Sequence, residues 1–326
     1  MNKEEKISLK NISVSIKDEL ECFESELETN FQSEVKFLQP LCDHMKSGKG
    51  KRIRPILFFL IQGLCGQPDV NTVAIPVFLE ILHTATLIHD DVIDKALKRR
   101  ETKTINVLWG NKTAILFGDY LFAKVLELGV ATRNFKILEF IVSVVKKISE
   151  GELRQAFKSQ EIKENVYYDI IRDKTAALFK VSCMLAGLSQ SLKEEDIIRL
   201  GNFGELFGMA YQIKDDILDI SGKTKLLGKS SQQDLSDGKF TLPFIIVYTR
   251  ASKKEKKYLQ DIISEGSAEG LKTAYAFIDK NRGLELTEKE LMSISREAEK
   301  ILKDFNPSIY RDSLESLLEY NYLRKS

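Results

Sequence analysis

Residues 73–97 read VAIPVFLEILHTATLIHDDVIDKAL, and this stretch decides the class of fold. Its apolar residues recur at spacings of three and four and cover more than half of a helix circumference, which is typical of a helix at the centre of a protein. Similar patterns occupy residues 113–131, 135–158 and 196–220. We find no series of segments with the period-two alternation and hairpin turns of strands. The sequence therefore predicts an all-α protein built from long helices.

The composition is that of a globular chain. Hydrophobic residues make up 43% and charged residues 30% of the 326 residues, which excludes wholesale disorder. The formal charge is +1, which excludes a general nucleic-acid-coating protein because such a protein would be strongly basic. Residues 221–239 and 252–257 are rich in Gly, Ser or charge and are predicted to be loops, but no Pro/Gly/Ser-rich linker divides the chain. We expect a single helical domain over residues 1–326.

The four cysteines, Cys22, Cys42, Cys65 and Cys183, lie far apart and form no CxxC pair. This distribution excludes a disulfide scaffold and a Cys-rich zinc site, and it favours a reducing compartment. The N-terminal residues are charged throughout and lack the apolar core of a secretory signal. The most apolar run, residues 55–66, is too short to cross a bilayer. We expect a cytoplasmic protein without a transmembrane segment.

Two short acidic clusters each follow an apolar run of helical pattern. They are Asp90, Asp91 and Asp94 after ILHTATLIH, and Asp215, Asp216 and Asp219 after FGMAYQI. Aspartates four apart share one face of a helix and repel each other, and at a helix C-terminus they also oppose the negative end of the dipole. A solvated helix end would explain one such cluster. Two copies indicate a bound divalent cation, which would remove both penalties.

The clusters offer oxygen ligands, which suit Mg²⁺, with Mn²⁺ as a substitute, rather than Zn²⁺. Mg²⁺ usually takes one or two carboxylates together with phosphate oxygens of a substrate. Two facing clusters would therefore hold ions that clamp a diphosphate. His83 and His89 are alternative ligands, although His89 could equally form a hydrogen bond with the adjacent Asp90.

Basic residues surround these clusters in the sequence. The segment GKGKRIRP, residues 48–55, combines glycines, a helix start at Pro55 and the cations Lys51 and Arg54, a pattern that suits phosphate oxygens. The other basic elements are Arg99 with Arg100, Lys174 with Thr175 inside a helix, and Lys229 with Lys239 in a loop. Each run alone is typical of a solvated surface. A nearly neutral chain that gathers its cations around two acidic clusters indicates a metal-bridged polyanion as the ligand.

Six motifs occur in an order that resembles the trans-isoprenyl diphosphate synthases, also called polyprenyl synthetases. They are GKGKRIRP (48–55), HTATLIHDDVIDKALKRR (83–100), GDYLF (118–122), KTAALF (174–179), YQIKDDILD (211–219) and GKSSQQDLSDGKFTLP (228–243). The resemblance runs from about residue 48 to the C-terminus. Within the family, the chain is most similar to members that make medium or long chains of the octaprenyl type.

The resemblance implies a bundle of long helices around a deep central cavity, in a homodimer. It implies a Mg²⁺-dependent prenyltransferase that condenses isopentenyl diphosphate head to tail with an allylic diphosphate. The implied metal ligands are Asp90, Asp94 and Asp215, supported by Asp91, Asp216 and Asp219. The implied isopentenyl diphosphate site consists of Lys51, Arg54, His83 and Arg100, and the allylic site of Arg99, Lys174, Thr175, Gln212, Lys229 and Lys239. The residues expected to be catalytic are Asp90, Asp94, Asp215, Lys174 and Lys229.

The product length is predicted from the helix before the first aspartate. In the family, a bulky aromatic residue about one turn before that aspartate closes the cavity and shortens the product. Ala85 and Thr86 are small, so we expect the growing tail to pass them toward Leu79 and Leu82. This favours an all-trans medium- or long-chain product, a precursor of a quinone side chain, with geranylgeranyl or farnesyl diphosphate as the alternative. Product release would involve transient contact with a membrane.

Two other functions remain open. A terpene cyclase shares aspartate-rich metal sites but needs no second diphosphate site, so the GKGKRIRP segment argues against it. A subunit of a heteromeric synthase is the further alternative, although a non-catalytic subunit could lose aspartates and both clusters here are complete. A Mg²⁺-dependent assay with isopentenyl diphosphate and an allylic primer tests these alternatives.

Overall fold

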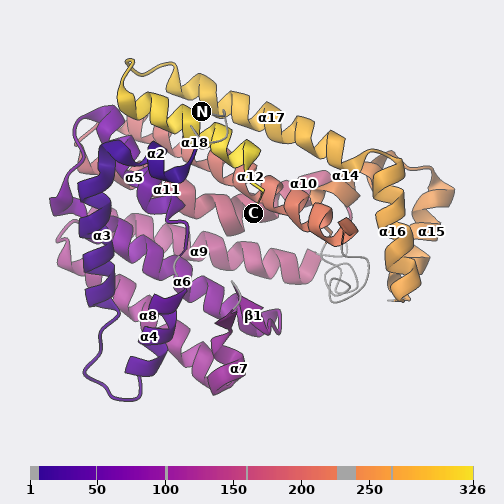
Figure 1. Ribbon diagram of the computed structural model, residues 1–326, viewed down its shortest axis with the longest axis horizontal. Helices are drawn as coiled ribbons and strands as arrows, with labels where there is room; N and C mark the ends of the chain where they lie inside the picture. The colour runs from indigo at the N-terminus through magenta and orange to yellow at the C-terminus, as the bar shows by residue number, and fades with distance from the viewer. Residues whose placement is uncertain are drawn as a thin grey trace.

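The computed structural model describes residues 7–48, 50–99, 102–158, 161–225, 240–265 and 267–325, and this part of the chain is almost entirely helical (Figure 1). In the N-terminal half the helices are α2 (Leu9–Ile12), η1 (Val14–Ile16), α3 (Lys17–Asn30), α4 (Gln39–Ser47), α5 (Ile53–Cys65), η2 (Val70–Thr72), α6 (Ala74–Ile93), α7 (Ile105–Trp109), α8 (Asn111–Ala131) and α9 (Phe135–Lys158). In the C-terminal half they are α10 (Glu164–Ile171), η3 (Arg172–Ala176), α11 (Ala177–Ser189), α12 (Glu194–Lys225), α14 (Leu242–Arg250), α15 (Lys253–Ser264), α16 (Ala268–Lys280), α17 (Gly283–Leu302) and α18 (Ile309–Leu323). The short strands β1 (Lys98–Arg99) and β2 (Thr102–Lys103) form an antiparallel pair.

The main core lies where α5, α6, α8, α9, α11 and α12 pack together. Side chains such as Phe58 of α5, Leu79 of α6 and Phe179 of α11 expose none of their surface. A second apolar cluster joins α10, α12 and α14, and a third joins α14 to α15 and α16 at the far end of the molecule (Figure 1). The all-α class is confirmed, and the helices predicted to be central, because of their wide apolar faces, include the buried α6.

The predicted helices differ from the observed ones mainly at their ends. Segments 113–131 and 135–158 correspond to α8 and α9, and residues 196–220 lie within α12. The helix predicted over residues 73–97 ends earlier, at Ile93. Its last turn is closed by a hydrogen bond of 2.8 Å from the N–H of Asp94 to the carbonyl oxygen of Asp90, but Lys95 has a φ of 51° and redirects the chain.

Both predicted loops are partly wrong. Residues 221–225 continue α12, while residues 226–239 lie outside the described residues. Residues 253–257 form the first turns of α15, because Ser252 and Glu255 form a capping box. The Ser252 hydroxyl accepts a hydrogen bond from the Glu255 N–H at 3.3 Å, and the Glu255 carboxylate accepts one from the Ser252 N–H at 2.9 Å.

A π-helical turn, η3, joins α10 to α11 and carries Lys174 and Thr175. Gly151 of α9 lies against this turn, where a Cβ atom would approach the Lys174 backbone nitrogen to 2.7 Å. Glycine is therefore needed for the close contact of the two segments. Wide turns of this kind often occur at functional sites. The sequence predicted a regular helix here and did not reveal the irregularity.

One described segment, Val70–Ile93, is long and apolar enough to cross a membrane by length and composition alone. The expectation of no transmembrane segment rests on the shorter apolar run of residues 55–66. In the structure, 56% of the most apolar 18 residues of this segment are buried inside the protein, and the segment includes the core helix α6.

Candidate active site

A cavity of about 530 Å³ lies between α6, α9, η3, α11 and α12, with the segment before α5 at its rim. Most of the residues predicted to form the site line this cavity: Lys51, Arg54, His83, Thr86, Asp90, Asp94, Arg99, Lys174, Thr175, Gln212 and Asp215. Segments from both halves of the chain therefore contribute to one place, as the hypothesis of a shared polyanion requires.

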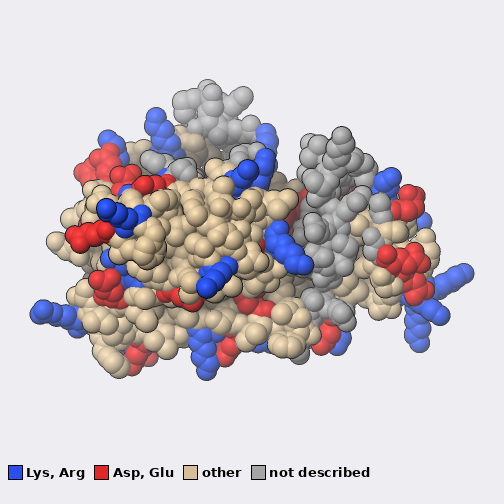
Figure 2. All heavy atoms as spheres, turned by 90° about the horizontal axis from the view of Figure 1, so that it is seen from below, with Lys and Arg blue, Asp and Glu red and all other residues tan. Residues whose placement is uncertain are grey.

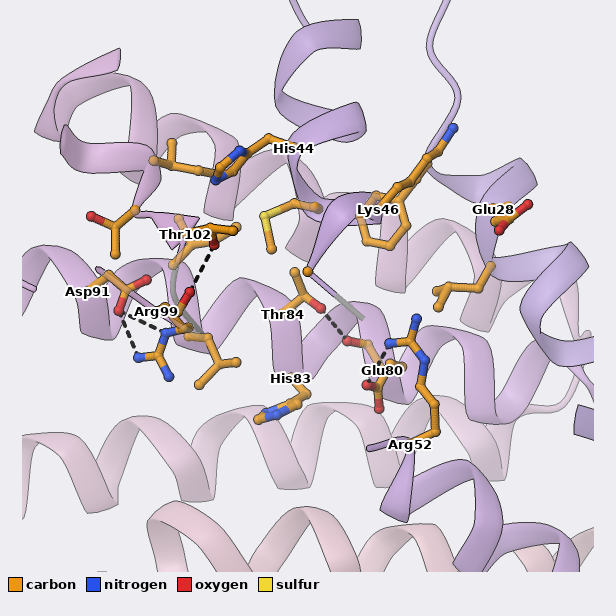
Figure 3. Close-up of a pocket in the computed structure, with 18 of the residues that line it drawn as sticks. Glu28, His44, Lys46, Arg52, Glu80, His83, Thr84, Asp91, Arg99 and Thr102 are labelled. Atoms are coloured by element: carbon orange, nitrogen blue, oxygen red, sulfur yellow. Dashed lines mark hydrogen bonds and ion pairs between the residues drawn. The ribbon is translucent and has the colours of Figure 1, made fainter. Parts of the chain in front are cut away.

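The acidic end of α6 presents two different faces. His83, Asp90 and Asp94 share the cavity side because they are seven and four residues apart. Asp91 lies on the other side of the helix, and its Oδ1 accepts two hydrogen bonds from Arg99, at 2.9 and 2.7 Å (Figure 3). Asp91 was expected to support the metal ligands. It is buried and does not line the cavity, but it holds the guanidinium of Arg99, which does.

His89, the alternative metal ligand, faces α8 instead of the cavity. Its Nε2 lies 3.0 Å from the carbonyl oxygen of Ile115. A Cβ atom at Gly118 would lie 2.1 Å from the same nitrogen, so the imidazole fits because this residue is glycine. The contact explains the glycine of the GDYLF motif and places His89 against α8, where its Nε2 also lies 3.6 Å from Oδ1 of Asp119.

On α12, Gln212 and Asp215 line the cavity, whereas Asp216 is buried. The Asp216 carboxylate accepts hydrogen bonds from the Tyr167 hydroxyl at 2.7 Å, from Nε2 of Gln212 at 3.0 Å and from the Leu242 N–H at 3.3 Å. Burial raises the pKa of Asp216 to about 7, although these hydrogen bonds act to lower it. Asp216 was expected to support the metal ligands. Its hydrogen bonds tie α12 to α10 and to the start of α14.

Lys174 lies among acidic side chains. Its ammonium group contacts the Glu152 carboxylate, lies 3.9 Å from Oδ2 of Asp90 and donates a hydrogen bond of 3.1 Å to Gln155. Burial raises the pKa of Asp90 to about 7, and the charges of Glu152 and Asp94 add to this rise. Burial acts to lower the pKa of Lys174, but Asp90 and Glu152 outweigh it and the pKa is raised. Lys174 thus neutralises only part of the negative charge of Asp90, Asp94 and Glu152, and a bound cation would neutralise more of it.

A short chain of hydrogen bonds links η3 to α12. The Thr175 hydroxyl donates to Oε1 of Gln212 at 2.9 Å, and Nε2 of Gln212 donates to Asp216. These two contacts fix the orientation of the Gln212 amide at the cavity wall. Thr175 and Gln212, both predicted for the allylic site, are therefore held by each other.

Two arginines lie over aromatic rings of the cavity wall. The guanidinium carbon of Arg54 is 4.4 Å from the centre of the Phe179 ring, and that of Arg324 is 4.2 Å from the centre of the Tyr211 ring. In such a cation–π contact, the aromatic ring supports the flat face of the guanidinium group and so fixes its orientation. Arg324 also forms an ion pair of 2.7 Å with Oδ1 of Asp215. The position of this acidic residue is thus set by a side chain near the C-terminus.

The donor set fits Mg²⁺. Asp90, Asp94 and Asp215 supply hard carboxylate oxygens from α6 and α12 to a single cavity. Within the described ranges, no three His, Cys, Asp or Glu side chains converge into a metal site of their own. Mg²⁺ needs no such cage, because it keeps several waters and shares phosphate oxygens of a substrate. The residues therefore fit ions that bind together with a diphosphate.

Four further residues of the predicted site are absent from the described lining of this cavity, three of them because they fall outside the part of the chain that the structure describes. Asp219 is exposed on α12, one turn beyond Asp215, and does not line the cavity. Arg100, Lys229 and Lys239 lie outside the described residues.

The four positions predicted to control chain length divide into two groups. Thr86 lines the cavity and is partly exposed, whereas Ala85, Leu79 and Leu82 expose none of their surface and belong to the core. Ala85 lies one turn before His89 and so shares the face that packs on α8. A tail that passed these three residues would have to displace core packing, but a tail that touches Thr86 would not.

Sequence reasoning missed four charged residues that line the cavity, namely Arg52, Glu80, Glu152 and Arg324. Glu80 could have been found from the sequence, because it is a single acidic residue within the apolar run of α6 and such a residue needs a polar partner. Arg52 lies inside GKGKRIRP, but the sequence does not say which cations of that segment face a ligand. Glu152 is one of many charged residues on α9, and Arg324 lies far from every motif, so only the packing of helices reveals them.

Comparison with known proteins agrees with this geometry. Residues 35–278 match the family model described as polyprenyl synthetase. The all-trans-nonaprenyl-diphosphate synthase (geranyl-diphosphate specific) of Rhodobacter capsulatus is 33% identical over 87% of this chain and 88% of its own. Heptaprenyl diphosphate synthase component 2 of Geobacillus stearothermophilus is 37% identical over 77% of this chain and 78% of its own. A solved polyprenyl synthase from Caulobacter crescentus CB15, complexed with calcium and isoprenyl diphosphate, has a TM-score of 0.90 at 28% identity, covering 98% of each chain. The chain therefore belongs to the polyprenyl synthetase family.

Proposed function

We propose that this chain is a Mg²⁺-dependent prenyltransferase that adds isopentenyl diphosphate repeatedly, head to tail, to an allylic diphosphate and releases an all-trans polyprenyl diphosphate of medium or long chain. The observation that carries the proposal is the shared cavity, to which the C-terminal end of α6 brings Asp90 and Asp94, α12 brings Asp215, and the rim brings Lys51 and Arg54. The similarity to a nonaprenyl and a heptaprenyl synthase supports a product of this length.

The acidic side of the cavity would bind the allylic diphosphate. Asp90, Asp94 and Asp215 would hold the ions that this diphosphate shares. When bound, Mg²⁺ neutralises the charge that develops on the departing diphosphate. Lys174 and Arg99 line the same cavity and would bind further phosphate oxygens, with Arg99 kept in place by its two hydrogen bonds to Asp91.

The basic rim would hold the second substrate. Lys51 and Arg54 bind the diphosphate of isopentenyl diphosphate so that its double bond lies near the allylic carbon. The allylic C–O bond breaks with its electron pair on the leaving diphosphate, the double bond forms the new C–C bond, and a proton is then lost to the released diphosphate. Leu87, Ile148 and Leu178 provide apolar wall that excludes water from the carbocation.

We also propose a homodimer formed through α7, α8 and α9. The exposed large apolar side chains on these helices are Val107, Leu108, Trp109, Ile115, Leu116, Leu126, Val130, Phe135, Val142, Leu153 and Phe157. Figure 2, seen from the side of α7 and α8, shows a broad central area with few charged side chains. Apolar surface of this extent is typical of an interface between subunits. Light scattering should give twice the chain mass, and Val130→Glu should lower it to that of a monomer.

The proposal is tested with purified protein, labelled isopentenyl diphosphate, and geranyl, farnesyl or geranylgeranyl diphosphate as primer. We expect labelled polyprenyl diphosphates in the presence of Mg²⁺ and none after chelation. Hydrocarbon products from the primer alone, without consumption of isopentenyl diphosphate, would show a cyclase and contradict the proposal.

A second candidate is the catalytic subunit of a heteromeric synthase. It is favoured by the similarity to heptaprenyl diphosphate synthase component 2. A chain that is inactive alone but gains activity when a cell extract of its source is added would support this candidate over the homodimer.

A further inference from the structure

Arg52 lies between the two basic residues of the rim, yet its own guanidinium is engaged by carboxylates. Its Nε and Nη2 donate to the two oxygens of Glu24 on α3, at 2.7 and 3.2 Å. Its Nη1 donates to Oε1 of Glu80 on α6 at 3.2 Å (Figure 3). The paired contact with Glu24 uses the planar fork that distinguishes Arg from Lys. One side chain of the segment before α5 thus connects it to two other helices.

The three side chains form a shielded group. The Glu80 side chain is 8% exposed, that of Arg52 20% and that of Glu24 34%. The guanidinium also lies 5.9 Å from the centre of the Phe23 ring. A charge that is partly buried and bonded to two carboxylates contributes little further attraction for a phosphate group. Arg52 therefore differs in its surroundings from Arg54, whose guanidinium is stacked on Phe179.

The backbone at Arg52 is also specialised. Its φ is 56°, in the left-handed region that residues other than glycine seldom adopt, and such a conformation persists where the surrounding contacts fix it. The Arg52 carbonyl oxygen accepts the first hydrogen bond of α5, from the Ile56 N–H at 3.0 Å. The direction in which the chain enters α5 is thus set at Arg52, and with it the placement of Lys51 and Arg54 at the rim.

We propose that Arg52 is a positioning residue, clamped by Glu24 and Glu80, that holds Lys51 and Arg54 in place to bind the diphosphate of isopentenyl diphosphate. The inference rests on the proposed function. It gives the N-terminal helix α3 a part in substrate binding, although Glu24 does not line the cavity of the candidate active site.

The substitution Glu24→Gln distinguishes a positioning role of Arg52 from a purely electrostatic one, because the two roles predict opposite changes in the affinity for isopentenyl diphosphate. It removes a negative charge near the rim, so if Arg52 acted only through its charge, isopentenyl diphosphate would bind more tightly. If Arg52 acts by position, loss of the clamp weakens binding. We expect the KM for isopentenyl diphosphate to rise about tenfold, the loss of roughly one charge-assisted hydrogen bond, with little change in the KM for the allylic primer or in kcat.

Glu21→Gln is the matched control, because Glu21 lies three residues before Glu24 on α3 and its exposed side chain forms an ion pair of 3.4 Å with Lys17. It makes the same charge change and should leave both KM values unaltered. Arg52→Lys provides a second variant, since it keeps the charge but loses the fork, and it should raise the same KM as Glu24→Gln. Thermal unfolding of each variant establishes that the compared proteins are folded.

A lower or unchanged KM for isopentenyl diphosphate in folded Glu24→Gln would overturn the positioning role, as would equal rises in both KM values. Failure of the proposed function is recognised separately, by a wild-type protein without turnover. In that case calorimetric titration with inorganic diphosphate in the presence of chelator still reports on the basic rim. Weaker binding in Glu24→Gln than in wild type and Glu21→Gln supports the role of Arg52, and equal or tighter binding refutes it.

Discussion

Thr86 offers the sharpest test of how the tail leaves the metal end of the cavity. It lies four residues before Asp90, about 6 Å along the helix axis, and it lines the cavity. A phenyl ring in its place would fill space directly below the site of condensation. We expect Thr86→Phe to shift the product from a medium or long chain to farnesyl or geranylgeranyl diphosphate.

The structure gives the stability cost of this change. The Thr86 hydroxyl donates a hydrogen bond of 2.8 Å to the carbonyl oxygen of His83, whose loss costs about 1 kcal/mol. Because Thr86 is partly exposed to the cavity, the ring needs little rearrangement. Ala85 exposes none of its surface, so Ala85→Phe would overpack the contact with α8 at a cost of about 1–3 kcal/mol. Thr86→Phe should therefore remain folded more readily than Ala85→Phe, although the sequence alone does not distinguish the two positions.

The assay is chromatography of the products after dephosphorylation, for wild type and both variants at equal turnover. Turnover of Thr86→Phe should stay within about tenfold of wild type, since the aspartates are intact. An unchanged product distribution in Thr86→Phe would refute this account of the tail path. A shift in Ala85→Phe alone would mean that the tail enters between α6 and α8.

Two further predictions concern the diphosphate sites and the buried aspartate. Lys51→Ala should raise the KM for isopentenyl diphosphate more than the KM for the primer. Lys174→Ala should raise the KM for the primer more than the KM for isopentenyl diphosphate. If each substitution raised both KM values equally, the assignment of these residues to two separate sites would be wrong. Tyr167→Phe should lower the unfolding free energy by about 1–3 kcal/mol, because Asp216 loses a buried hydrogen bond and keeps those from Gln212 and Leu242. Chemical denaturation measures this loss, and an unfolding free energy equal to that of wild type would contradict the anchoring role.

The sequence predicted the helical class and the cavity-facing aspartates because both follow from periodicity. Apolar residues at spacings of three and four define a helix, and the same period places Asp90 and Asp94 on one side of α6. Periodicity also turns Asp91 away from them, since a neighbouring residue is rotated by about 100° on a helix. The resemblance gives Asp91 and Asp216 only a supporting part, and their hydrogen bonds to Arg99 and Tyr167 join distant segments, so the sequence could not show what each carboxylate holds.

Other features depend on contacts that a single sequence does not encode visibly. The pairing of Arg52 with Glu24 joins a loop to a helix outside the matched family region. The ion pair of Arg324 with Asp215 joins the last helix to α12. The burial of Ala85 depends on where α8 packs, not on the residue itself. Each is a tertiary contact between distant segments, so neither local pattern nor composition could reveal it.

The central claim is that the aspartates of α6 and α12 act on one diphosphate through shared ions. It is tested most directly by turnover at saturating Mg²⁺ in Asp90→Ala and Asp215→Ala, with Asp304→Ala, a surface aspartate with a 61% exposed side chain, as the control. Loss of an electrostatic clamp costs about 3–4 kcal/mol, so each active-site variant should be slower by two to three orders of magnitude while the control is unaffected. Turnover like that of wild type in folded Asp90→Ala or Asp215→Ala would contradict the claim.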